Sequence, residues 1–201
     1  QFHYRHQCLA LNGNRLQVKN LLDAQLSEQP FDAIVLACGA VSWSQLGSDG
    51  AWQRWLAQDE ITAFEASNAG VQRVWSTFMQ PVFGQPLKRV EAWVTDQAKT
   101  SGDIVITHYG LESGLVYKQG RALRAQAHAG QRMQLHLDLL PDVSVAQLAQ
   151  KLQPSKKQSL SNVWRKAGLD PAKASLIREL VAKTLWDQPQ ALAQQIKDLT
   201  I

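Results

Sequence analysis

Residues 31–50 read FDAIVLACGAVSWSQLGSDG, and this stretch decides which fold the sequence predicts. Its first part, residues 31–37, is a short continuous apolar run that leads to a glycine, a pattern typical of a strand buried on both faces in a parallel sheet. A loop of small residues follows. Ser48 and Asp49 are favourable residues at the start of a helix, and tryptophan and leucine then recur at helical spacing. The stretch therefore predicts a buried strand, a small-residue loop and a helix over 49–58.

A hairpin is predicted upstream of this stretch. The segments 3–11 and 15–19 flank Asn12-Gly13-Asn14, and Asn-Gly supplies the positive φ angles that a tight hairpin turn requires. We therefore expect two antiparallel strands near the start of the chain.

Up to residue 143 the sequence favours strands, with one helix among them. Strands are predicted over 87–94, 103–107 and 132–138, the last from strict alternation of apolar and polar residues that makes Asp138 part of a solvated face. A helix is predicted over 115–128. This part of the chain is therefore expected to mix sheet and helix.

After residue 143 the periodicity is helical. Ser144 and Gln147 form a capping-box pattern for a helix that ends near residue 152, and Asp170-Pro171 is a typical helix start. The second helix is expected to run to about Trp186, with Glu179 and Lys183 as an exposed ion pair. The whole sequence thus predicts the α+β class, with a small helical bundle at its end.

Composition excludes several classes of protein. With 201 residues, 45% hydrophobic and 19% charged, the chain is unlike disordered, collagen-like or coiled-coil sequences. The longest apolar run, Ala33–Cys38, is far shorter than the ~20 residues of a membrane span, and no signal peptide is recognisable. No membrane partner is expected, and two cysteines 30 positions apart favour a reducing cytoplasm. Because position 1 is Gln, we expect a piece of a longer protein.

The loop after the first buried strand is the first candidate site. Small residues let backbone N–H groups approach a ligand closely, and the start of a helix favours anionic groups. An ordinary strand-to-helix connection is the alternative interpretation, since spacing alone is a weak signal.

Three segments, in order, resemble motifs of one bacterial flavoprotein family. Residues 37–50 are similar to its A-x-G-G-x-S-W-P-x-L-G-S-D-G stretch, residues 102–114 (GDIVITHYGLESG) to G-E-L-x-x-T-x-x-G-[IL]-x-G-G, and residues 157–162 (KQSLSN) to the start of K-S-L-S-N-x-L-R-K. The family comprises NAD(P)/FAD-dependent oxidoreductases, also described as aminoacetone-oxidase-like, BaiN-like and YhiN-like proteins. The departures from its motifs are Ala40, Ser44, Asp103 and Ser113.

The resemblance implies an architecture and a cofactor. Residues 1–66 would be the tail of an FAD-binding α/β domain, residues 67–143 the β-rich, barrel-like part of an inserted domain, and residues 144–201 its helical part. The insert would cover the substrate side of the flavin. The chain has no Gly-x-Gly-x-x-Gly fingerprint, which the family carries upstream, so FAD belongs to the full-length parent and is not expected to be retained here.

The same resemblance supplies candidate site residues. The expected cofactor contacts, made mainly through backbone, are Gly39, Ala40, Ser42, Trp43, Gly47, Ser48, Asp49 and Gly50. His108 and Tyr109 are the candidate catalytic proton donors, because both can act as general acids in a glycine-bounded loop. The alternatives are a solvated loop histidine and a packing tyrosine. A small organic substrate and NAD(P)H as electron donor are also implied.

A basic segment, residues 155–183, supports a competing function. It contains Lys156, Lys157, Arg165, Lys166, Lys173, Arg178 and Lys183. The turn at Gly168 between two helices is similar to a helix-hairpin-helix, whose amides bind nucleic-acid phosphates. Solvated faces of a helical bundle are the favoured alternative, so nucleic acid is not the expected partner. No metal site is predicted, since the five histidines lack partners at metal-ligand spacing.

Overall fold

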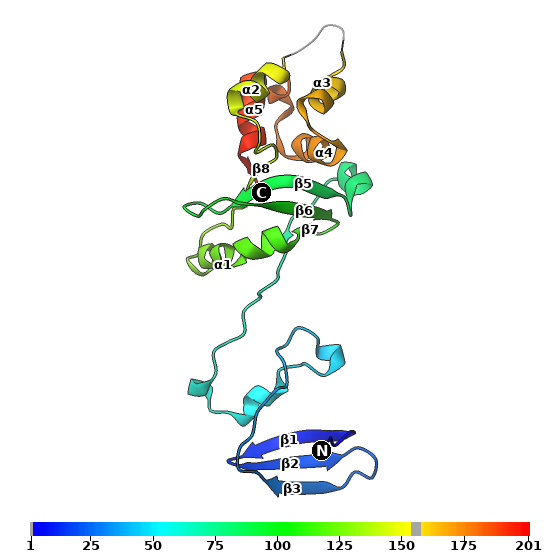
Figure 1. Cartoon of the computed structure of the whole chain (residues 1–201), viewed down its shortest axis with the longest axis vertical. Helices are drawn as coiled ribbons and strands as arrows, with labels where there is room; N and C mark the ends of the chain where they lie inside the picture. The colour runs from blue at the N-terminus through cyan, green and yellow to red at the C-terminus, as the bar shows by residue number, and fades with distance from the viewer. Residues whose placement is uncertain (1, 154–157) are drawn as a thin grey trace. The chain divides into compact units, whose positions relative to one another are not determined.

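The chain folds as two units, Gln1–Glu65 and Ala66–Ile201, in a computed structural model that describes residues 2–153 and 158–201. The first unit contains a three-stranded antiparallel sheet in the order β1-β2-β3, shown in blue in Figure 1. Its strands are β1 (His6–Asn12), β2 (Arg15–Asn20) and β3 (Leu26–Pro30). Asn12 pairs with Arg15 across the turn, which confirms the predicted hairpin.

The predicted buried strand over 31–37 is wrong. These residues form no strand, and the side chain of Val35 is 88% exposed. Periodicity reports that a segment is apolar, whereas a strand also needs a neighbour for its backbone N–H and C=O groups. Within the described residues no strand pairs with this segment, because β3 pairs with β2.

The helix predicted over 49–58 is also wrong in type and length. Two short 3₁₀ turns occupy this region, η2 (Ala51–Trp55) and η3 (Gln58–Glu60). Leu56 has extended backbone angles, φ −111° and ψ 157°, and so ends the first turn before an α-helix can propagate.

The second unit is built on a six-stranded antiparallel sheet in the order β4-β7-β6-β5-β8-β9, which curls into a half-barrel. The strands are β4 (Val71–Gln72), β5 (Pro86–Trp93), β6 (Thr100–Thr107), β7 (Gly110–Glu112), β8 (His136–Asp138) and β9 (Leu199–Thr200). The predicted strands over 87–94 and 103–107 correspond to β5 and β6. The strand predicted over 132–138 shortens to β8, and Asp138 is buried rather than solvated.

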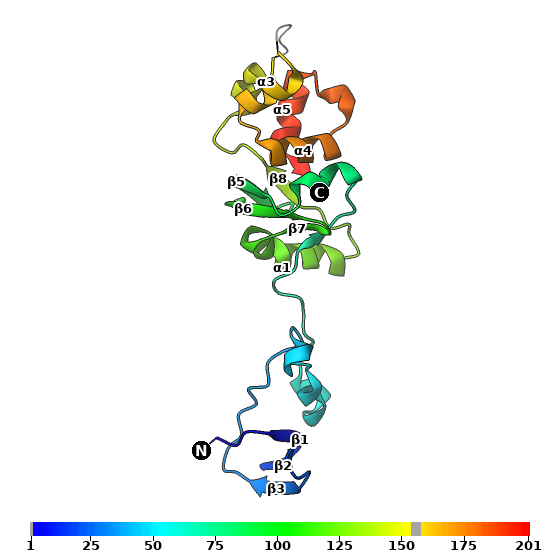
Figure 2. The same ribbon diagram turned by 90° about the vertical axis from the view of Figure 1, so that its right-hand side faces the viewer.

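Helices cover both faces of this sheet. Figures 1 and 2 show α1 on one face and the other four helices on the opposite face. The helices are α1 (Gly114–His128), α2 (Val145–Lys151), α3 (Leu160–Ala167), α4 (Pro171–Leu180) and α5 (Pro189–Lys197). In the part of the chain that the structure describes, no helix is long and apolar enough to cross a membrane.

Local sequence signals fix the helix starts more accurately than the ends. The capping box of Ser144 and Gln147 is present, and the Asp170 side chain accepts the backbone N–H of Lys173 at 2.9 Å. The helix that begins at Pro171 ends at Leu180 instead of Trp186, because Val181 adopts extended angles. The predicted pair of Glu179 with Lys183 is wrong, since Glu179 accepts the N–H and hydroxyl of Ser76 at 2.8 and 2.6 Å.

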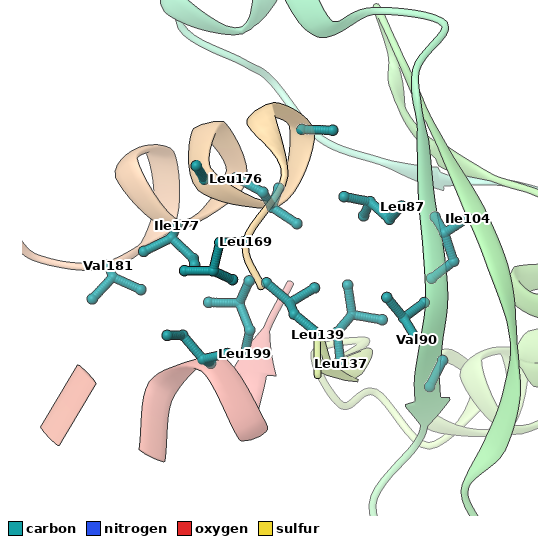
Figure 3. Packing of buried hydrophobic residues seen from close by; sticks show 14 of the residues in the cluster. Leu87, Val90, Ile104, Leu137, Leu139, Leu169, Leu176, Ile177, Val181 and Leu199 are labelled. Carbon is teal, nitrogen blue, oxygen red and sulfur yellow. The ribbon is translucent and has the colours of Figure 1, made fainter. Parts of the chain in front are cut away.

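The core of the second unit lies between the sheet and the helices. Figure 3 shows Leu87, Val90 and Ile104 of the sheet on the side that faces Leu176 and Ile177 of α4. All five side chains are 0% exposed. Burying each aliphatic side chain contributes about 1.5–3 kcal/mol, so this layer holds the helices on the sheet.

One buried ion pair lies inside this apolar layer. Lys197, in the last turn of α5, contacts the Asp138 carboxylate at 2.7 Å, and the two side chains are 15% and 3% exposed. The Lys197 ammonium also donates to the carbonyl oxygens of Leu140 at 2.8 Å and Val143 at 2.7 Å. The Asp138 carboxylate accepts the Leu140 N–H at 3.0 Å. The charge of each partner is thus compensated.

The substitution Lys197→Met tests how much this ion pair contributes to the free energy of unfolding. It leaves the Asp138 carboxylate buried without its cation, so we expect the free energy of unfolding to fall by about 3–5 kcal/mol. Urea denaturation followed by circular dichroism at 222 nm reports on this unit, which contains the described α-helices. The matched control is Lys118→Met on the exposed side of α1. Equal stability of the two variants would contradict the assigned role.

Candidate functional site

The loop of residues 39–50 is folded back on itself. Ser48 Oγ donates to the carbonyl oxygen of Ala40, and Trp52 Nε1 donates to the carbonyl oxygen of Gly39 at 2.8 Å. A Cβ atom at position 39 would lie 2.5 Å from Ser48 Oγ, and the φ angle there is 71°. Glycine is therefore required at position 39 for this loop to close.

Part of this loop offers free backbone donors. Among the described residues, no hydrogen bond uses the N–H groups of Gly39, Ala40 or Ser42. Trp43 is 69% exposed, and Asp49 caps the following turn by accepting the Ala51 N–H at 3.0 Å. Unused N–H groups can bind acceptor atoms of a ligand, so the predicted cofactor residues 39–43 have suitable chemistry.

Gly47 and Asp49 lie elsewhere in the same unit, in the wall of a cavity of about 550 Å³. Trp52, Arg54 and Trp55 also line it. Ser48 and Gly50 are used structurally, since Ser48 bonds within the loop and Gly50 accepts the N–H of Gln53 at 3.1 Å. The carbonyl oxygen of Trp43 accepts the Leu46 N–H at 2.9 Å and so also holds the loop. The eight predicted contacts thus divide into free donors, cavity-lining residues and residues that hold the loop.

The predicted catalytic pair, His108 and Tyr109, occupies the turn between β6 and β7. The two rings meet edge to face with centroids 4.9 Å apart. The backbone carbonyl of Tyr109 accepts the Arg73 N–H at 2.8 Å, which holds the turn against the segment after β4. Gly110 makes this approach possible, because a Cβ atom there would lie 1.9 Å from the carbonyl oxygen of Val71.

The hydroxyl of Tyr109 is paired with a carboxylate. It donates to Glu112 Oε2, and this hydrogen bond raises the pKa of the phenol above its ordinary value. Partial desolvation and the negative charge of Glu112 raise the pKa further. Tyr109 is therefore a neutral donor at physiological pH. Glu112 was missed in the sequence analysis, although it lies inside the second motif.

Two neighbouring cavities lie beside the segment after β4, which this turn contacts. One, of about 400 Å³, is lined by Arg73, Trp75, His108 and Tyr109. Trp75 Nε1 donates to the carbonyl oxygen of Thr107 at 2.9 Å, so the indole wall is fixed.

The second cavity, of about 350 Å³, shares Gln72 and Arg73 with the first. Apolar side chains of α1 and of the segment before β8 line it, together with Arg73, Arg124 and Arg132. A mostly apolar pocket with a few polar groups is typical of a small-molecule site. No sequence signal marked these arginines, because they come from three separate segments.

The basic segment is divided by the structure. Gly168, with φ 108°, forms the predicted turn between α3 and α4. The Arg178 guanidinium lies over the Trp164 ring at 4.9 Å and donates to Ser161 at 2.9 Å, so it has a packing role. Lys156 and Lys157, and with Lys157 the start of the third motif, lie outside the described residues. Within the described ranges no group of three or more His, Cys, Asp or Glu residues could hold a metal ion.

The fold and cavities define a class: a curled antiparallel sheet with a helical bundle on one face and a ligand-sized pocket beside it. The family model described as the HI0933-like protein barrel and H2TH domain matches residues 65–201, more than half of the chain. The chain therefore belongs to the HI0933-like flavoprotein family. A comparison with the curated proteins gives no match. The resemblance to a flavoprotein family is confirmed at this level.

The titration of Tyr109 tests the pairing with Glu112. Glu112→Gln removes the negative charge and the carboxylate acceptor, so we expect the pKa of Tyr109 to fall toward its ordinary value of 10.0. Nuclear magnetic resonance of ring-labelled tyrosine separates Tyr109 from Tyr4 and Tyr117. Glu91→Gln is the control and should leave the titration unchanged. An identical Tyr109 pKa in both variants would refute the pairing.

Proposed function

We propose that this chain is mainly the substrate-side cap domain of an FAD-dependent oxidoreductase. The observation that carries the proposal is the family match over residues 65–201, joined to a ligand-sized cavity beside the His108–Tyr109 turn. In this proposal residues 1–66 are the tail of the FAD-binding domain, residues 67–143 the β-rich part of the cap and residues 144–201 its helical part.

The exposed apolar segment supports the assignment of the first unit. Residues 31–37 are an apolar segment that pairs with no strand among the described residues, and Val35 is almost fully exposed. Such a segment is stable in water only when other strands or helices cover it. We infer that strands of the parent's FAD-binding domain supply that cover.

The loop of residues 39–43 fits a cofactor of this kind. Its unused N–H groups suit the carbonyl and phosphate oxygens of FAD, and exposed Trp43 offers an aromatic face. When bound, the flavin supplies hydride transfer, and the protein supplies position and electrostatics. Because the glycine fingerprint is absent from the chain, these contacts alone would hold the cofactor weakly.

The roles of the cap residues follow from their chemistry. Tyr109 would donate a proton to the substrate from its neutral hydroxyl, which the Glu112 carboxylate orients, and His108 would serve beside it. The apolar wall of the neighbouring cavity would bind the organic part of a small substrate. Arg73 and Arg132 would orient an anionic group on it. NAD(P)H as electron donor completes the proposal.

The activity of the parent enzyme tests whether Tyr109 acts as the general acid. Tyr109→Phe keeps the ring and removes the proton, so we expect kcat to fall about 10²–10⁴-fold, the usual contribution of general acid catalysis. Tyr117→Phe is the matched control, because Tyr117 packs against the core of the same unit. His108→Ala is measured alongside, and unchanged turnover would remove His108 from the site. Equal kcat in the two tyrosine variants would do the same for Tyr109.

The visible absorption spectrum tests whether the 201-residue chain holds FAD by itself or only as part of its full-length parent. We expect purified protein with these 201 residues to be colourless, since the fingerprint that seats the pyrophosphate is absent from it. The full-length parent should show the flavin absorption band near 450 nm. A yellow preparation of the 201-residue chain would contradict the expectation, and a colourless parent would overturn the proposed function.

A further inference from the structure

A third pocket of the Ala66–Ile201 unit is strongly basic, and it shares no lining residue with the two cavities described above. Its volume is about 470 Å³, and residues of β5, α2, α3, α4 and the loop after β8 line it. The cationic side chains that line it come from four elements and are Lys88, Arg89, Lys151, Lys166 and Lys173. Two carboxylates, Asp142 and Asp170, also line it, so cations are in clear excess.

Lys173 is the most informative member of this group. Its side chain is 5% exposed, yet within the described residues its ammonium has neither an ion-pair nor a hydrogen-bond partner. Burial lowers the pKa of Lys173, the charge of Arg89 lowers it further, and Asp170 raises it. Buried cationic side chains in proteins are normally paired, so an ammonium without a partner beside an open pocket suits a negative group that enters this pocket.

The nearby carboxylates already have partners. Asp138 is held by Lys197 at 2.7 Å, and Asp170 caps α4 by accepting the Lys173 N–H. Asp103 accepts the Arg89 N–H at 2.8 Å. The negative charges of Asp170, Asp103 and Asp138 raise the pKa of Lys173 through space, but none of the three carboxylates forms an ion pair with its ammonium.

A β-bulge places two of the cations at the pocket. The register of β5 shifts against β6 between Leu87 and Val90, and Arg89 has a positive φ of 50°. A bulge redirects side chains out of the regular alternation of a strand, at a cost in strain for a residue that is not glycine. As a result the consecutive residues Lys88 and Arg89 both line the pocket.

We propose that this pocket binds a phosphorylated small organic molecule, with the phosphate against Lys173 and Arg89. A guanidinium fork and an ammonium are the donors that proteins use for phosphate. The volume exceeds what a phosphate alone would fill, and Leu140, Pro141 and Val143 supply an apolar wall for an organic part. The proposal does not rest on the flavin assignment.

The pocket changes the interpretation of the basic segment, residues 155–183, as a nucleic-acid-binding site. Of the described cations in 155–183, only Lys166 and Lys173 line it, and they are joined by Lys88 and Arg89 from the sheet. Cations gathered around one pocket suit a single small anion. A nucleic-acid backbone would need them spread along an exposed face.

Binding is measured by isothermal titration calorimetry on the 201-residue chain at constant ionic strength, with inorganic phosphate and phenyl phosphate as probes. We expect both to bind, phenyl phosphate more tightly, and Lys173→Met to raise both dissociation constants at least tenfold. Lys183→Met, which removes an exposed cation of the same segment outside the pocket, should leave them unchanged.

A substitute double variant and a DNA-binding measurement complete the experiment. Should Lys173→Met lose its helical circular dichroism, Lys166→Gln combined with Lys88→Gln replaces it, because both side chains are exposed and their loss leaves the core intact. Equal weak binding by wild type and variants overturns the proposal, as does no binding at all. Salt-dependent retention of a 20-base-pair DNA duplex that is lost in the same variants also overturns it, in favour of a nucleic-acid site.

Discussion

The second unit depends on the contact between Lys197 and Asp138. β8 is only three residues long, and α5 leads directly into β9, which pairs with β8 at the end of the sheet. Lys197 fixes the end of α5 to the carboxylate of β8 and to the carbonyl groups of the loop that follows it. A short strand contributes few ladder hydrogen bonds, so this buried pair adds to the apolar packing of α5 in fixing where the last helix and the last strand lie.

Short sequence motifs correctly predicted turns and helix starts, because these features depend only on neighbouring residues. Asn12-Gly13, Ser144 with Gln147, and Asp170-Pro171 act on backbone groups of their immediate neighbours. The hairpin turn and the two helix starts that they predict are present in the structure. The errors concern partners distant in sequence. The alternation of apolar and polar residues predicted a solvated Asp138. This prediction was wrong because the cation that pairs with Asp138, Lys197, lies in a helix near the other end of the unit. The two-residue strands β4 and β9 are too short for any periodicity.

The candidate site shows the same division. The turn of His108 and Tyr109, together with Glu112, lies within a single motif, so the sequence could indicate it. Arg73 and Arg132 become part of the site only because β4 pairs with β7 and because Leu135 exchanges hydrogen bonds with Ile201. Pairing between such segments depends on the whole sheet, and a single sequence carries no local sign of it.

The sheet also explains how one small unit can hold two ligand sites. Figures 1 and 2 show α1 and the other helices on opposite faces of the sheet. Residues of α1 line the apolar cavity, and residues of α2, α3 and α4 line the basic pocket; the two share no lining residue. The first is lined mainly by apolar groups with arginines among them, whereas the second gathers cations around a buried and unpaired ammonium. Because the two pockets share no lining residue, a substitution that removes a contact in one of them leaves the contacts of the other in place. Substitutions in one pocket therefore test that pocket alone.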